Sequence, residues 1–149
     1  MNIYEINKNT LALIPINKEK TKIIEKEKSY IIDSNIMKII NNSCTSFGSS
    51  YKGRFDSTKK LIGVSYKAPI IIEESNGIIY FPTTSPKQDN CCWLSLNHIK
   101  NYYKENNYIY IVFDTEFSMK LELSLNSFNN QYLNALKLYN LIKNKIQNF

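Results

Sequence analysis

The sequence predicts a single α+β domain with antiparallel β-sheets, a short basic helix in the middle and a long amphipathic helix at the C-terminus. The chain has 149 residues, which suits one compact domain. Short apolar segments of strand length alternate with turn residues, whereas apolar residues recur at helical spacing after Ser127. No repeat, linker or change of composition interrupts the chain, so residues 1–149 are expected to form one domain.

The N-terminal third is expected to form strands. Residues Thr10 to Ile16 predict a short strand that ends near Pro15. Lys20 to Ile32 alternate charged and apolar residues well enough for one or two strands with a solvated face. The apolar run Ile36 to Ile40 follows and ends at three polar residues.

A short basic helix is expected from Ser49 onward. Its apolar face is formed by residues at helical spacing: Tyr51, Phe55, Thr58 and Ile62. The other face is formed by charged residues: Lys52, Asp56, Lys59 and Lys60. Ser49 or Ser50 can cap the start, and Gly63 can serve as the left-handed stop. Gly53 costs stability in the first turn of this helix.

The second half of the chain begins with a predicted hairpin, in which Ile70–Ile72 and Ile78–Phe81 flank a polar turn. Pro82–Asn90 is a predicted loop. Both a strand and a short helix fit within Trp93–Tyr103, and we favour a helix from Asn97.

Two strands and a helix are expected to complete the chain. Tyr108–Phe113 is rich in aromatic and β-branched residues, and the strict alternation of Met119–Leu125 predicts a half-buried strand. Ser127 is expected to cap the last helix. Its apolar stripe is formed by Phe128, Tyr132, Ala135, Leu136, Tyr139, Ile142 and Ile146. This stripe completes the core or pairs subunits, and we favour the core.

Several classes of protein and site are excluded by what the sequence lacks. Three cysteines, with Cys91 and Cys92 adjacent, do not make a disulfide framework, and one histidine, His98, is too few for a Cys/His zinc cluster. The N-terminus does not resemble a signal peptide, and the apolar runs fall far short of the ~20 residues of a transmembrane helix. We therefore expect a cytoplasmic protein that uses no metal, cofactor or membrane.

No catalytic site assembles from these residues, so the sequence does not predict an enzyme. Gly48 and Gly53 have the spacing of a phosphate-binding loop, but Arg54 and Phe55 follow where an ATPase needs Lys and Ser or Thr. His98 has no nucleophile-elbow serine to activate. Two interpretations of the glycines stay open: amide groups at the helix start hold a phosphate of a polymer, or the glycines only permit tight packing.

The net charge of +6 favours phosphate-rich or acidic partners. Cations cluster between Lys52 and Lys67 around one acidic residue, Asp56, which suits either a nucleic-acid backbone or a solvated surface. Because Arg54 is the only arginine, AT-rich or narrow-groove DNA is favoured over guanine reading. The expected DNA-binding residues are Ser49, Ser50, Lys52, Arg54, Lys59, Lys60 and Lys67, the serines as phosphate donors. The lysines expected to be solvated, or to make a secondary DNA contact, are Lys137, Lys143 and Lys145.

Several short motifs follow one another in a specific order. They are Cys44–Arg54 (CTSFGSSYKGR), Lys67–Ile70 (KAPI), Tyr80–Thr83 (YFPT), Cys91–Ser95 (CCWLS) with His98, and Ser127–Gln131 (SFNNQ). Together they resemble the competence transcription factor family, ComK, from about Thr10 to the final helix. The block with the pattern FGSSYxGR is by itself a strong marker of this family.

The resemblance implies a bacterial transcription activator that binds AT-rich boxes in double-stranded DNA as a homo-oligomer, from the minor-groove side, and switches on DNA-uptake genes. Thr45 departs from the basic residue of some relatives, and Cys92 replaces a glycine. The chain ends at Phe149, whereas the best-known members continue into a tail that a proteolytic adaptor recognises. The alternative expectation is a shortened paralogue, a protein-interaction module that hetero-oligomerises with a full-length activator.

Overall fold

The computed structural model of the protein describes residues 3–147. Its strands are β1 (Thr10–Asn17), β2 (Lys20–Glu25), β3 (Ser29–Ile32), β4 (Ile70–Glu73), β5 (Ile78–Pro82), β6 (Trp93–Ser95), β7 (Ile99–Glu105), β8 (Tyr108–Phe113) and β9 (Ser118–Leu121). Its helices are α1 (Ile36–Ser46), α2 (Tyr51–Ile62) and α3 (Leu125–Gln147), with one 3-10 turn, η1 (Leu96–His98). The described strands form two antiparallel sheets, in the orders β3-β2-β1-β6-β5-β4 and β7-β8-β9.

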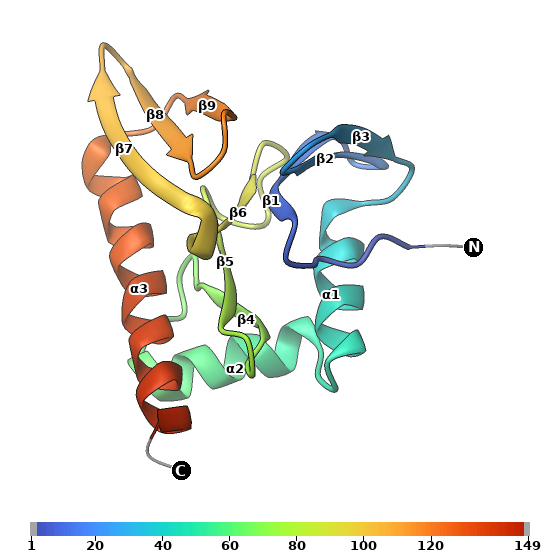
Figure 1. The fold of residues 1–149 in the computed structure, drawn as a ribbon, viewed down its shortest axis with the longest axis vertical. Helices are drawn as coiled ribbons and strands as arrows, with labels where there is room; N and C mark the ends of the chain where they lie inside the picture. Colours follow the sequence, from blue (N-terminus) through green and yellow to red (C-terminus); the bar gives the residue numbers. More distant parts are fainter. Residues whose placement is uncertain (1–2, 148–149) are drawn as a thin grey trace.

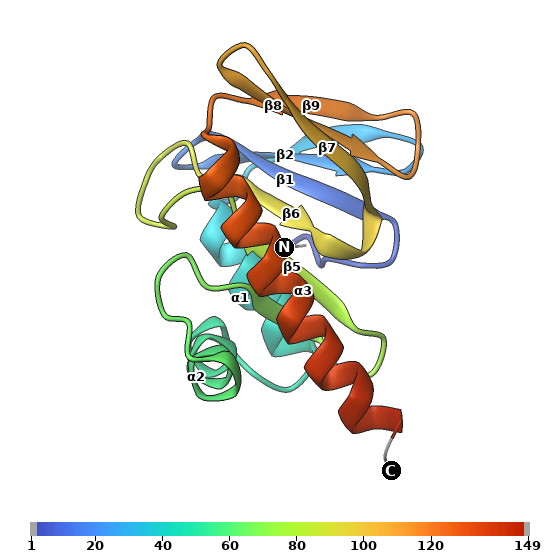
Figure 2. The same cartoon turned by 90° about the vertical axis from the view of Figure 1, so that its left-hand side faces the viewer.

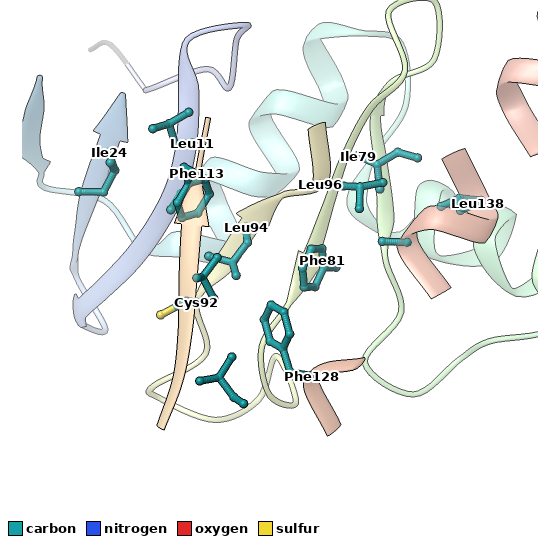
Figure 3. Close-up of a cluster of buried hydrophobic side chains, with 14 of the residues drawn as sticks. Leu11, Ile24, Ile79, Phe81, Cys92, Leu94, Leu96, Phe113, Phe128 and Leu138 are labelled. Carbon is teal, nitrogen blue, oxygen red and sulfur yellow. The ribbon is translucent and has the colours of Figure 1, made fainter. Parts of the chain in front are cut away.

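The larger sheet is the middle layer of the molecule, because both of its faces are covered (Figure 1). One face packs on α1 and α2, and the other packs on β8 and α3. Figure 3 shows side chains of this second cluster, in which Phe113 of β8 and Phe128 and Leu138 of α3 meet residues of the large sheet. The molecule therefore has two hydrophobic cores that share one sheet.

Alternation along the strands explains why the sheet can serve two cores. Successive residues of a strand point to opposite faces. Tyr80 and Trp93 thus enter the core beside α1 and α2, while their neighbours Phe81 and Leu94 enter the core beside α3. All four are fully buried. An uninterrupted apolar run such as that of β5 is therefore a strand with two covered faces, although the sheet is antiparallel.

The predicted α+β class, with antiparallel sheets, a short middle helix and a long C-terminal helix, is confirmed. The predicted strand at Thr10–Ile16 is β1, and the segment Lys20–Ile32 forms two strands, β2 and β3. The predicted hairpin is β4 and β5, and the strand at Tyr108–Phe113 is β8. The choice of core packing for α3 is also confirmed, because Phe128 and Ala135 are fully buried. The side chain of Ile146 lies outside the described part.

The apolar run at Ile36–Ile40 belongs to a helix, α1, to which the sequence analysis assigned no element. Asn35 caps this helix, because its side-chain oxygen accepts a hydrogen bond from the amide of Met37 at 2.8 Å. Ile36, Ile39 and Ile40 then lie on one buried face, at the spacing of a helix.

The helix predicted from Asn97 is wrong, since only the single turn η1 separates β6 from β7. The side chain of Asn97 accepts a hydrogen bond from the amide of Ile79 at 3.1 Å and donates one to the carbonyl of Gly77 at 2.7 Å. These bonds tie the turn to the β4–β5 hairpin. The chain then pairs with β8 as a strand, a long-range contact that local spacing does not reveal.

The end of the last strand and the start of α3 were also misplaced. The strand predicted at Met119–Leu125 is β9, which already ends at Leu121, and α3 begins at Leu125. Ser127 is therefore inside the helix and is not its cap. Ser124 takes that role, because its hydroxyl oxygen accepts a hydrogen bond from the amide of Ser127 at 3.1 Å.

Candidate nucleic-acid interface

The predicted site begins at the junction between α1 and α2, where a glycine ends α1. Gly48 has φ +85°, in the left-handed region. Its amide donates to the carbonyl of Thr45 at 3.0 Å, and the amide of Ser49 donates to the carbonyl of Cys44 at 3.1 Å. These two bonds form a Schellman motif, which satisfies the last carbonyls of α1. Gly48 is therefore required by the turn that places the start of α2.

Of the two serines predicted as possible caps, Ser50 caps α2. Its hydroxyl oxygen accepts a hydrogen bond from the amide of Gly53 at 3.0 Å. The amide of Tyr51 is also occupied, because it donates to the side-chain oxygen of Asn41 of α1 at 2.9 Å. The amide of Lys52, in contrast, makes no hydrogen bond within residues 3–147. It could still reach a phosphate, as could the hydroxyl hydrogen of Ser50.

Gly53 makes room for this cap. A Cβ atom at this position would lie 2.8 Å from Oγ of Ser49 and 3.2 Å from Oγ of Ser50. A larger residue would therefore push against both serine hydroxyls. The tight-packing interpretation of the two glycines thus has direct support at Gly53, and Gly48 has its own role in the turn.

The buried side of α2 joins it to the sheet. Thr58 is fully buried, and its hydroxyl donates to the carbonyl of Pro69 at 2.6 Å. Tyr51 packs edge-on against Trp93, with ring centroids 6.1 Å apart, and Phe55 packs against the same core. Gly63 ends the helix at φ +71°. The predicted apolar face, cap and stop of this helix are therefore confirmed.

Three predicted lysines come together on the exposed side of α2. Residues 52, 59 and 60 fall within about 100° around a helix of 3.6 residues per turn. Lys52 forms an exposed ion pair with Asp56 at 3.2 Å, which contributes little to stability. In the described part of the chain, neither Lys59 nor Lys60 has a carboxylate within 4.0 Å. We call Lys52, Lys59 and Lys60 the α2 lysine face, and α2 lies at the lower edge of the molecule in Figure 1.

Arg54 lies on a different side of α2 and is half-buried. It follows Lys52 by two residues, which corresponds to about 200° around the helix. It lines a pocket of about 430 Å³ together with Phe47, Glu73, Glu74 and Ser75. Its Nε atom is buried and has no hydrogen-bond partner in the described residues. The structure therefore does not bring the only arginine onto the α2 lysine face.

Lys67 lies in the loop after α2 and turns toward α3. It has φ +52°, and its Nζ atom lies 3.3 Å from the hydroxyl of Ser127 and 5.2 Å from the ring centroid of Tyr66. Lys67 is half-buried, whereas Tyr66 is 70% exposed. Lys67 is therefore a neighbour of the start of α3 and not a member of the α2 lysine face.

A second surface with cations and aromatic rings lies on the β7–β9 sheet, where the sequence analysis placed no binding residue. Tyr103 and Tyr110 stack across the strands with an interplanar angle of 11°, and Nζ of Lys120 lies 4.7 Å from the ring centroid of Tyr108. The sequence contained a signal for this surface, because the alternation in β8 places Tyr108 and Tyr110 on the side of the strand opposite buried Ile109. Glu105, which is opposite Tyr108 in the register, lowers the charge of this surface.

The three thiols are buried and belong to the two cores. Burial raises the pKa of Cys44 to about 11, and the nearby charge of Arg54 acts in the opposite direction. Burial likewise raises the pKa of Cys92 to about 12 and also raises that of Cys91. These side chains are therefore protonated at neutral pH and pack as small apolar groups.

His98 ties the N-terminal segment to the small sheet. Its Nδ1 lies 3.1 Å from a carboxylate oxygen of Asp114, and its Nε2 lies 2.8 Å from the carbonyl oxygen of Lys8. Within residues 3–147 no cluster of three or more potential metal ligands is present. Over the same residues, no helix is both long and apolar enough to cross a membrane.

Comparison with known proteins identifies the family. The family model described as ComK protein matches residues 1–147. The chain is 37% identical over 132 residues to the competence transcription factor of Bacillus subtilis (strain 168), an alignment that covers 86% of this chain and 69% of that protein. No solved structure matches the chain. Because the family model extends over nearly every residue and the relative is similar along most of its length, this chain belongs to the ComK protein family.

Proposed function

We propose that the protein is a competence transcription factor that binds double-stranded DNA in the bacterial cytoplasm and activates DNA-uptake genes. The observation that carries the proposal is the α2 lysine face, in a chain that belongs to the ComK family and is similar to a competence transcription factor. Exposed lysines attract phosphate and release its counterions when they bind, and in the described residues Lys59 and Lys60 have no carboxylate partner that would compete. The expected affinity is therefore strongly dependent on salt.

The geometry of α2 supports contact with the DNA backbone. Lys52 and Lys60 are eight residues apart, which is about 12 Å along a helix. The lysines of this face can therefore reach different phosphates. The hydroxyl of Ser50 and the amide of Lys52 are donors at the start of the same helix. We propose that Ser49 lies beside them at the edge of the contact.

Preference for AT-rich DNA is part of the proposal. Lysine is a point charge and does not make the bidentate contacts with which arginine reads guanine. Arg54 lines a pocket together with Glu73 and Glu74, and these carboxylates would oppose the approach of a phosphate there. A narrow, easily deformed groove suits a binder that relies on the backbone. We propose that Arg54 and Lys67 flank the contact and that the α2 lysine face carries it.

Two partners in this proposal rest on the family alone. The first is a second copy of the chain, because we expect a homo-oligomer on DNA. The second is a proteolytic adaptor. The described surface does not assign either of them to particular residues.

A DNA titration with charge-reversed variants tests the proposal. Fluorescence anisotropy would compare AT-rich and GC-rich 30-base-pair duplexes between 50 and 300 mM KCl, with Lys59→Glu/Lys60→Glu as the test variant. We expect AT preference in the wild-type protein, and at least about tenfold weaker binding by the variant. Its slope of log K against log salt should fall by about 2, one unit for each lost phosphate contact.

The matched control is Lys22→Glu/Lys104→Glu, which changes the net charge equally at exposed lysines of β2 and β7. This control should retain most of the affinity. Equal losses in both double variants would show that only the net charge matters and would contradict a site on α2. No binding by the wild-type protein, together with co-elution of a full-length homologue, would favour the protein-interaction module instead.

A further inference from the structure

The solvent side of α3 carries leucines that the fold does not use. Leu133 is 53% exposed and Leu141 is 39% exposed. They line a shallow groove of about 370 Å³ whose walls are formed by Leu133, Leu136, Lys137, Asn140, Leu141 and Asn144. We call these six residues the α3 groove. They form two neighbouring rows with a spacing of four residues, namely 133, 137 and 141 beside 136, 140 and 144, so together they make one continuous stripe along the helix.

This stripe lies opposite the face that α3 buries. Ala135, Leu138 and Ile142 are buried against the large sheet and β8. At about 100° per residue, their side chains are centred roughly half a turn from the α3 groove. A helix on the surface of a protein normally has polar residues on its outer side. Apolar residues on both sides of α3 therefore indicate a surface that a partner covers.

The fold leaves the outer side of α3 open. In Figure 1, α3 runs along one edge of the molecule. Figure 2 is viewed from that edge, and α3 crosses in front of β5 with α2 to one side of it. The described elements that pack against α3 include α2, β5, β8 and η1, and the buried residues of α3 face the core that it shares with the large sheet and β8.

The charge of α3 indicates the chemistry of the partner. The segment Leu125–Gln147 contains lysines but no aspartate or glutamate. Lys137 is a member of the α3 groove, and Lys143 lies near it with Nζ 5.9 Å from the ring centroid of Tyr139. A partner with leucine-like side chains on one face and carboxylates beside them would fill the groove and neutralise these lysines.

A second copy of the chain fits this surface less well. An antiparallel pairing about the centre of the groove would bring two Lys137 side chains together, with no carboxylate on either helix to offset them. From Leu133 to Asn144 the groove is about 16 Å long, and a helix is about 10 Å wide. The resulting area, on the order of 160 Å², is far below the ~800 Å² that each partner buries in a standard interface.

DNA also fits less well, because the walls of the groove are mainly leucine and asparagine, with one lysine. We propose that the α3 groove docks a short acidic amphipathic helix, of about three turns, from another protein. The binding is transient, as expected of a small interface. This inference does not depend on DNA binding by α2, because the two surfaces share no residue.

A peptide titration tests the proposal on the full chain. The probe is a fluorescein-labelled 18-residue peptide with leucines at helical i, i+3 and i+7 positions and glutamates at the remaining positions. The controls are a scrambled peptide of the same composition and one with lysines in place of the glutamates. We expect saturable one-to-one binding of the acidic amphipathic peptide at micromolar concentration, and at least tenfold weaker binding of both controls.

Variants locate the peptide on α3. Leu133→Asn/Leu141→Asn should weaken binding at least tenfold, and Lys137→Glu should weaken it about threefold to tenfold. Leu125→Asn and Lys145→Glu are matched controls on the same helix outside the groove, and they should change affinity less than twofold. Circular dichroism would show that all four variants keep their helix content. AT-rich DNA affinity, measured in parallel, should be unchanged by the leucine variant.

Four results would overturn the inference. One is the absence of peptide binding at 100 µM, and another is equal binding of the acidic and lysine peptides. Self-association of the wild-type protein that the Leu133→Asn/Leu141→Asn variant abolishes would assign the groove to a second copy. Loss of DNA affinity in that variant would assign the groove to DNA. Failure of DNA binding in the wild-type protein and in every variant would contradict the proposed DNA-binding function and would leave the inference about the α3 groove intact.

Discussion

Single residues decide where α1 ends and where α2 begins. Gly48 supplies the left-handed turn, Ser50 supplies the cap, and Gly53 leaves space for the serine hydroxyls. These three residues set the turn between the two helices and the first turn of α2. Ser49 and Ser50 were interchangeable as caps in the sequence, but in the structure only Ser50 accepts a hydrogen bond from the helix.

Replacing the two serines separately should distinguish their roles. Ser50→Ala removes the acceptor of the Gly53 amide, so we expect the free energy of unfolding to fall by about 1 kcal/mol. Ser49→Ala is the matched control, and its effect should stay within about 0.5 kcal/mol. Urea unfolding followed by circular dichroism measures both values. Equal losses in the two variants would contradict the assignment of the cap.

At the scale of elements, α3 is the clearest case of a helix with two apolar sides. Its inner side contributes Phe128, Ala135 and Leu138 to the core, and its outer side carries Leu133 and Leu141. The periodicity of the sequence predicted an apolar stripe, but the predicted stripe omitted Leu138 and included Leu136, which lines the groove. The pattern contains too many leucines for periodicity to choose the buried side.

Truncating one leucine on each side should show which side holds the fold together. Leu138 is fully buried, so Leu138→Ala is expected to lower the free energy of unfolding by about 2–5 kcal/mol through lost burial and a cavity. Leu133→Ala is the control on the exposed side and should change the free energy of unfolding by less than about 0.5 kcal/mol. Denaturant unfolding gives both numbers. A comparable loss in Leu133→Ala would mean that its exposed side also supports the core.

At the scale of the whole molecule, one sheet serves two cores, and each core contains at least one buried thiol. Cys44 and Cys91 pack in the core beside α1 and α2, and Cys92 packs in the core beside α3. Burial raises all three pKa values because a thiolate loses its hydration inside the protein. The folded state therefore holds these protons at a pH where the unfolded chain releases them.

The free energy of unfolding should consequently fall as the pH rises above about 9. A thiol in an unfolded chain has a pKa of about 8.5, whereas burial raises the pKa of Cys44 to about 11 and that of Cys92 to about 12. Between these pKa values the unfolded state binds fewer protons than the folded state, so the free energy of unfolding decreases with pH. The decrease is about 1.4 kcal/mol per pH unit for each thiol. Urea unfolding from pH 7 to pH 10 measures it. Constant stability up to pH 10 would show that the thiols are accessible to water.

Local patterns predicted the elements whose signals are contained within a dozen residues. The spacing of Tyr51, Phe55 and Thr58 predicted α2, and the capping serines and Gly63 marked its ends. The helix α1 also had such a signal, because Asn35 precedes isoleucines at helical spacing. The segment after Asn97 had none, because its strand forms only through pairing with β8. Helix signals are local, whereas pairing of strands depends on residues that are distant in the sequence.

The sequence by itself determined the fold class, the basic helix and the family, because periodicity, capping residues and motif order are properties of short segments. Tertiary structure decided which cations share a surface. Helical geometry brings Lys52, Lys59 and Lys60 together. Packing places Arg54 in a pocket with Glu73 and Glu74, away from these lysines, and it holds Lys67 beside Ser127. Distances between side chains on different elements follow from the packing of the layers, and a linear pattern of residues does not contain them.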